Sequence, residues 1–234
     1  MRTYRQYCPI ARASEIVAER WTPLVVRNLL WGATTFSAIA QGVPTMSRSM
    51  LIKRLGELQR AGIVEVTPKP TGHGSLYTLT AAGRDLAGVV DALAQWGIRW
   101  LEATSEHSDP GFALWAWCRL QLDHERLPPG RVVVRFTFPE EPPSNRRYWL
   151  LVEQGEGELC YSDPGGELDA DVVARSDPFA RWHRGDLPWA DALRSGSITV
   201  TGRAPVVRAL PTWNRHTPDF TRAAPASSPA PALG

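Results

Sequence analysis

The stretch from Pro44 to Gly62, PTMSRSMLIKRLGELQRAG, constrains the fold more than any other part of the chain. Its leucines recur at spacings of four and three, which place them on one face of a helix. We expect Ser47 to cap this helix, with Met46 as an apolar anchor before it, and Gly62 to end it. The apolar face then holds Leu51, Leu55 and Leu58, and the opposite face holds Ser49, Lys53, Gly56 and Arg60.

Such a helix suits a DNA major groove, because its outer face is small or basic and its first turn is polar. The alternative is an ordinary surface helix with a solvated basic face. The preceding segments favour the first interpretation, since apolar periodicity predicts helices over 8–19, 22–32 and 35–41 and a turn over 42–45. In that second helix, Thr22 is the expected cap. The order helix, turn, helix results.

The periodicity changes directly after Gly62. Residues 63–66 and 75–79 are predicted strands, joined by the turn-rich loop PKPTGHG. A helix-turn-helix followed by a two-stranded hairpin is a winged helix. Lys69 and His73 would lie at the tip of the wing, where they could contact phosphate or a minor groove.

A predicted helix of about 24 residues, 81–104, closes this part of the chain. A small winged helix cannot cover so long an apolar stripe alone. Packing against a second copy is the favoured explanation, and burial under a second domain is the alternative. The predicted dimerisation residues are Leu86, Val90, Leu93, Gly97 and Trp100.

Residues 5–104 resemble the MarR-related HxlR family of bacterial winged-helix regulators. The resemblance rests on Cys8-Pro9, Arg20-Trp21-Thr22, Leu29-Leu30, Phe36, Ile39, Arg54-Leu55, Ala61-Gly62-Ile63-Val64, Tyr77-Thr78-Leu79-Thr80 and Trp96-Gly97. It implies a homodimer that binds a palindromic operator in double-stranded DNA. One departure is Thr35, where the family usually has an arginine that contacts the DNA backbone.

The predicted recognition helix supplies most of the candidate DNA contacts. Arg48 is the best candidate for bidentate guanine recognition. Arg54 would contact phosphate or fix the helix in place. The full set is Ser47, Arg48, Ser49, Ile52, Lys53, Arg54, Lys69 and His73.

Three cysteines, Cys8, Cys118 and Cys160, are far apart in the sequence and form neither a disulfide framework nor a zinc motif. Some relatives in the resembled family sense oxidants through a thiol near the N-terminus, and Cys8 occupies that position. Arg5 and Arg12 could lower its pKa. Ordinary helix packing is the alternative role.

Charge is distributed unevenly along the 234 residues. Residues 1–104 carry 12 Lys/Arg against 7 Asp/Glu, net +5, and residues 105–234 carry 14 against 17, net −3. The first part can therefore attract a polyanion. No apolar run approaches the ~20 residues that span a bilayer, so we expect a cytoplasmic protein at the bacterial nucleoid, without a membrane partner.

Residues 105–220 are predicted to form a second, α+β domain, followed by an Ala/Pro/Ser-rich disordered tail over 221–234. Predicted elements include a helix over 112–127 and a hairpin over 148–162. The segment 179–213 resembles the sterol carrier protein-2 (SCP2) type of lipid-binding domain, which implies a sheet covered by helices around an apolar tunnel. For any single candidate pocket residue, ordinary core packing is the favoured alternative. The candidates are Trp115, Phe179, Trp182, Leu187, Trp189, Leu193 and Leu210.

Known catalytic motifs are missing from the sequence: it has no GxxxxGK, GxSxG or HExxH, and no cofactor motif. We therefore expect a transcription regulator modulated by a hydrophobic molecule, and no enzyme. Two alternatives stay open. The protein could be a lipid or polyketide-like ligand carrier that uses the winged helix to dimerise, or a regulator switched by Cys8.

Overall fold

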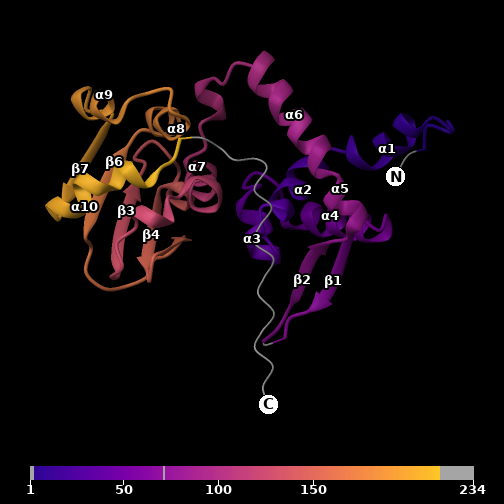
Figure 1. The fold of residues 1–234 in the computed structure, drawn as a ribbon, viewed down its shortest axis with the longest axis horizontal. Helices are drawn as coiled ribbons and strands as arrows, with labels where there is room; N and C mark the ends of the chain where they lie inside the picture. Colours follow the sequence, from indigo (N-terminus) through magenta and orange to yellow (C-terminus); the bar gives the residue numbers. More distant parts are fainter. Residues whose placement is uncertain (1–2, 71, 217–234) are drawn as a thin grey trace. The chain divides into compact units, whose positions relative to one another are not determined.

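The computed structural model describes residues 3–70 and 72–216, which form two compact units with a boundary between Leu101 and Glu102 (Figure 1). The predicted tail, 221–234, lies outside the described residues. Within the described part, none of the helices has both the length and the apolar composition needed to cross a membrane.

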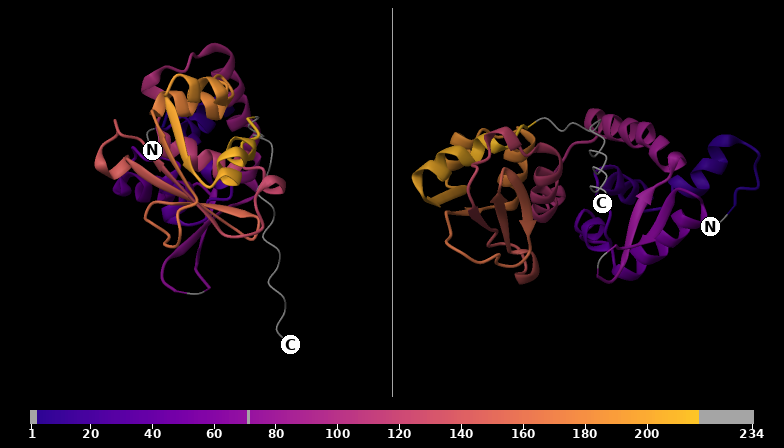
Figure 2. Two further views of the ribbon diagram at one scale, coloured as in Figure 1. Left: turned by 90° about the vertical axis from the view of Figure 1, so that its left-hand side faces the viewer. Right: turned by 60° about the horizontal axis from the view of Figure 1, so that its bottom comes forward.

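The first unit is a winged helix-turn-helix, as predicted. Its core takes residues from three helices: Val25, Ile39 and Leu51 are at most 1% exposed. The wing extends beyond the helices (Figures 1 and 2). The elements are α1 (Pro9–Val17), α2 (Thr22–Leu30), α3 (Phe36–Gln41), α4 (Arg48–Arg60), β1 (Val64–Pro68), β2 (Ser75–Leu79), α5 (Ala81–Asp85) and α6 (Ala87–Trp100).

The wing is tied to the helices by its second strand. β1 and β2 pair antiparallel, with Val66 opposite Tyr77. Tyr77 N–H also donates to the Thr34 carbonyl at 2.8 Å, and Thr35 forms a bridge with Leu76. The second strand of the wing is therefore joined to the residues that directly precede α3 in the sequence.

Two local predictions for the first unit were wrong. The cap of α2 is Trp21, in the left-handed conformation at φ 77°, while Thr22 is the first helical residue and its buried hydroxyl has no partner among the described residues. The helix predicted over 81–104 breaks at Leu86, so that α6 has 14 residues. Leu86 is the C-cap of α5, where its N–H donates to the Gly83 carbonyl at 3.3 Å, and α6 begins at Ala87.

The second unit contains a five-stranded mixed sheet with helices. The strand order is β5-β4-β3-β6-β7, in which β3 and β6 are parallel and every other pair is antiparallel. The hairpin between β4 and β5 turns through Gln154-Gly155, two residues at positive φ that suit a tight turn. The elements are α7 (Pro110–Ala116), β3 (Val132–Thr137), β4 (Arg147–Glu153), β5 (Glu156–Cys160), β6 (Ala170–Ala174), α8 (Ser176–Arg184), α9 (Trp189–Arg194), β7 (Ile198–Gly202) and α10 (Ala204–Ala209).

One face of this sheet packs against aromatic side chains from the helices. Along β4, Tyr148, Leu150 and Val152 are at most 4% exposed, whereas the alternate residues are half-buried or exposed. The Trp117 and Phe179 rings lie 6.0 and 5.7 Å from Phe136 on β3. The core of the second unit is therefore a layer of rings between sheet and helices.

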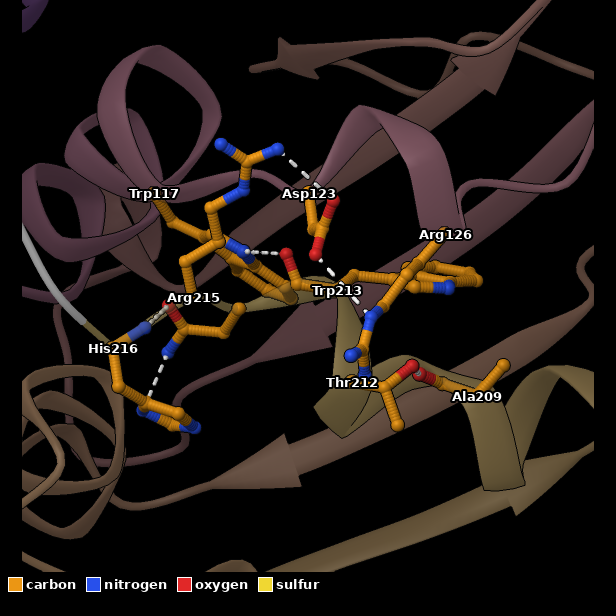
Figure 3. A network of polar contacts seen from close by, with 9 residues as sticks. Trp117, Asp123, Arg126, Ala209, Thr212, Trp213, Arg215 and His216 are labelled. Atoms are coloured by element: carbon orange, nitrogen blue, oxygen red, sulfur yellow. Dashed lines mark hydrogen bonds and ion pairs between the residues drawn. The ribbon is translucent and has the colours of Figure 1, made fainter.

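The helix predicted over 112–127 is shorter than expected. After α7 the chain forms a π-helix, η2 (Trp117–Gln121), and then extends at Leu122, which bridges Asn214. The Trp117 indole N–H donates to the Trp213 carbonyl at 3.2 Å, and Asp123 pairs with Arg215 at 3.1 Å (Figure 3). These contacts join the end of the described chain to η2 and to the residues that directly follow it.

Candidate nucleic-acid interface

Recognition helix α4 is built as its sequence indicates. The Ser47 hydroxyl accepts a hydrogen bond from the Met50 N–H at 3.3 Å and so caps the helix. Leu51, Leu55 and Leu58 are at most 2% exposed. The exposed residues of the first two turns are Arg48, Ser49, Ile52 and Lys53.

Arg48 is held against an aromatic ring at the start of α4. Its guanidinium carbon lies 5.0 Å from the centroid of the Phe36 ring, on α3. Stacking uses the face of a guanidinium and leaves its N–H edge available for hydrogen bonds. Phe36 therefore restricts the rotamers of a side chain that could still bind a base edge or phosphate.

Arg54 does not belong to the exposed face. Only 7% of its side chain is exposed, and it pairs with Glu57 at 2.7 Å and with Glu19 at 3.3 Å. A side chain enclosed between two carboxylates cannot reach phosphate, so its predicted DNA contact is wrong. The alternative, that Arg54 fixes the helix, agrees with these contacts, which tie α4 to the end of α1.

Lys69 and His73, the two residues predicted to contact the DNA backbone, lie at the tip of the wing. Lys69 N–H donates to the Gly74 carbonyl at 3.1 Å, which closes the tip and leaves the Lys69 side chain half-buried. His73 is exposed. Both groups lie at the end of the hairpin, away from the core of the unit.

Thr35, the departure from the resembled family, has a local structural role. Its hydroxyl accepts a hydrogen bond from the Ala38 N–H at 3.2 Å and caps α3. A threonine can make this cap.

Two helices of the first unit present apolar side chains to solvent. None of the residues of α6 is buried by the described chain, and Leu93, Trp96 and Trp100 are 50%, 56% and 65% exposed. The sequence did not predict that α1 is equally uncovered, with Ile10 77% exposed. Its apolar periodicity was visible, but periodicity alone does not say whether a face packs within the chain or against another one.

The three cysteines differ in environment. Burial raises the pKa of the Cys118 thiol to about 12 and also raises that of Cys160. Cys8 is partly exposed, at the N-cap of α1 and directly before Pro9. Thiolate chemistry is therefore disfavoured at the two cysteines of the second unit.

The residues predicted to line a pocket do not share one environment. Trp115, Phe179, Trp182 and Leu210 are at most 1% exposed and belong to the core of the second unit. Leu187 and Trp189 are half-buried, and the Trp189 ring lies 4.7 Å from Trp182. Leu193 is 41% exposed, whereas its neighbour Ala192 on the short helix α9 is buried.

Comparison with known proteins concerns the first unit. A family model described as HxlR-like helix-turn-helix matches residues 16–105. The uncharacterized HTH-type regulator YvaP of Bacillus subtilis is 34% identical over 100 residues, which cover 42% of this chain and 92% of YvaP. The uncharacterized regulator MT3179 of Mycobacterium tuberculosis is 34% identical over 115 residues, 43% of this chain and 72% of that protein.

The HTH-type regulator YodB of Bacillus subtilis is 33% identical over 97 residues, which cover 41% of this chain and 87% of YodB. The reduced form of YodB aligns with a TM-score of 0.37 at 30% identity, covering 42% of this chain and 97% of YodB. The family model ends at residue 105 and does not extend to the sheet of the second unit. Through its first unit, the chain belongs to the HxlR-like helix-turn-helix family of transcriptional regulators.

Proposed function

We propose that the protein is a homodimeric, sequence-specific DNA-binding transcription regulator. The observation that carries this proposal is the outer face of α4, where a helix with a buried leucine stripe exposes Arg48, Ser49, Ile52 and Lys53. The net charge of +5 over residues 1–104 supports a polyanionic partner. The wing would add backbone contacts through Lys69 and His73.

Two copies would associate through their exposed apolar helices. The α6 stripe exposes large apolar side chains that a second copy would bury, and so does the N-terminal segment at Tyr7 and Ile10. A two-fold axis would then present two α4 helices to successive major grooves. We expect half-sites about one helical turn apart, ~34–36 Å.

Hydroxyl-radical footprinting on the DNA upstream of the protein's own gene tests this arrangement. We expect two protected segments about 10 base pairs apart on one face of the duplex. Uniform weak protection along the duplex would count against sequence-specific binding and favour the ligand carrier.

We further propose that residues 102–216 form an SCP2-like sensor of a hydrophobic molecule. A sheet with one face covered by helices that carry aromatic side chains agrees with this, and the half-buried Trp189, whose ring lies 4.7 Å from that of Trp182, is the best candidate for a ligand contact. The ligand would regulate DNA binding only if it bound the DNA-competent and incompetent dimers with different affinity. Lipid extraction from the purified protein, followed by mass spectrometry, tests for a bound apolar molecule.

A second candidate places the switch at Cys8. The exposure of this thiol favours it, and the relative YodB has been solved in reduced, diamide-treated and quinone-bound forms. Diamide should then release the wild-type protein from DNA, and Cys8→Ser should resist it. Cys160→Ser is the matched control and should respond like the wild type.

A further inference from the structure

Among the described residues of α4, Ile52 is the one large apolar side chain that the helix leaves in solvent. It is 62% exposed, whereas Leu51, Leu55 and Leu58 on the same helix are at most 2% exposed. The helix has enough apolar residues on its inner side to pack without Ile52. A β-branched residue also has slightly lower helix propensity than a polar alternative such as lysine or glutamine, so neither packing nor propensity explains this position.

The surroundings of Ile52 point to DNA as its partner. Ile52 follows Arg48 by four residues and Ser49 by three, so these three side chains adjoin on the helix surface. Lys53 is exposed beside them. An apolar side chain surrounded by cations and a hydroxyl fits the major groove, where phosphates line both sides and the only apolar group on a base edge is the thymine 5-methyl.

The next turn of α4 leaves room for that contact. A β-carbon at Gly56 would meet only a guanidinium nitrogen of Arg60, at an ordinary 3.7 Å. The fold therefore does not require glycine there, although glycine in a helix interior costs about 1 kcal/mol relative to alanine. A missing side chain four residues after Ile52 lets a groove edge approach Ile52 closely.

We propose that Ile52 reads sequence by packing on a thymine 5-methyl group in each half-site. This inference rests on the proposed DNA-binding function. Arg48 would select a guanine by hydrogen bonds, and Ile52 would select a thymine about one turn further along the helix by apolar contact.

The test uses two forms of one duplex, the DNA upstream of the protein's gene, amplified with either dTTP or dUTP. Deoxyuridine keeps every hydrogen-bonding group and removes only the methyl. We expect the wild-type dimer to bind the methyl-free duplex about fourfold more weakly for each half-site, the loss expected for one buried methyl-sized group. Ile52→Ala should bind both duplexes equally.

Lys69→Ala is the matched control, since it should weaken binding yet keep the full dependence on the methyl groups. Equal binding of both duplexes by the wild type, or an undiminished difference in Ile52→Ala, would overturn the role of Ile52. A change in the sedimentation of Ile52→Ala would also overturn it, by placing Ile52 in a protein contact. Failure of the proposed function looks different: the wild type would then not prefer the upstream duplex to a scrambled one.

Discussion

The two arginines in the first half of α4 have opposite environments. Arg48 is exposed and stacked on Phe36, whereas Arg54 is enclosed by Glu57 and Glu19. Substitutions at the two positions should therefore separate DNA recognition from stability, although both remove one positive charge from the same helix.

Arg48→Ala should weaken binding to the specific duplex by roughly 1 to 3 kcal/mol and relax base preference, because a bidentate base contact is lost. Lys69→Ala should instead weaken binding to all sequences alike. Anisotropy titrations with specific and random duplexes measure both effects. An equal loss on the two duplexes for Arg48→Ala would remove Arg48 from base recognition.

Arg54→Met should lower the free energy of unfolding by about 2 to 3 kcal/mol, since it leaves the Glu57 carboxylate without its partner in a site that is only 12% exposed. Arg60→Met, on an exposed residue in the last turn of α4, is the control and should change stability by less than about 0.5 kcal/mol. Urea denaturation compares them. Equal midpoints for the two variants would contradict the structural role of Arg54.

His183 on α8 couples the stability of the second unit to pH. Burial, with smaller effects from His216 and Arg184, lowers its pKa from 6.5 to about 3. Its ring Nδ1 has no hydrogen-bond partner among the described residues. Between these two pH values the unfolded chain binds a proton at this residue and the folded chain does not, so stability must fall as the pH drops below 6.5.

We expect the free energy of unfolding to fall by about 1 kcal/mol for each pH unit below 6.5 on account of His183. Urea denaturation at pH 7.5 and pH 5, followed by tryptophan fluorescence, measures the loss. His183→Gln should show a smaller loss, while His73→Gln, on the exposed wing, should behave like the wild type. The same pH dependence in His183→Gln would show that other groups cause it.

At the scale of elements, the junction between the wing and α6 depends on one glycine. A β-carbon on Gly83 would lie 2.2 Å from the Ile63 carbonyl oxygen and 2.9 Å from a Leu79 methyl, so α5 could not pack in place. A β-carbon on Gly88, one turn further on, would meet nothing within 4 Å among the described residues. The two glycines therefore form a matched pair.

Gly83→Ala should destabilise the protein by about 2 to 3 kcal/mol, because backbone atoms must move to admit the methyl group. Gly88→Ala should leave stability unchanged or raise it by up to about 1 kcal/mol, since alanine is the better helix former. Thermal denaturation of both variants checks the signs. A stable Gly83→Ala protein would contradict the tight packing of α5 against Ile63 and Leu79.

Local signals predicted the elements whose boundaries depend on neighbouring residues in the chain. The Ser47 cap, the leucine spacing and Gly62 sufficed for α4, and β1 and β2 followed from the glycines of the wing. The break at Leu86 and the π-helix at Trp117 were not predictable in this way. At the π-helix, Trp117 contacts Trp213, which is 96 residues away, and periodicity does not report such a contact.

The candidate site was predictable to a similar extent. Helical spacing identified Ser49, Lys53 and Arg60 as outward-facing, and all three are exposed. The role of Arg54 depended on Glu19, which is 35 residues away, so only the structure could place it. The solvent exposure of α1 could be seen only in the structure, for the same reason.

At the scale of the whole molecule, the proposed function requires a second copy of the chain. Leu93→Glu should shift the dimer to monomer, since it would place a charge in the centre of the α6 stripe, where Leu93 is 50% exposed in one chain. Gln95→Glu, on the opposite face of α6, is the control. Sedimentation velocity measures both, and an unchanged dimer in Leu93→Glu would exclude the stripe as the interface.

The central claim is sequence-specific binding of DNA by the first unit. Fluorescence anisotropy tests it most directly, with a duplex from the protein's own upstream region and a scrambled duplex of equal length, each titrated across a salt series. We predict tighter binding to the upstream duplex, with an affinity that falls steeply as salt rises because counterions are released from phosphates. Equal, weak binding to both duplexes at every salt concentration would contradict the account.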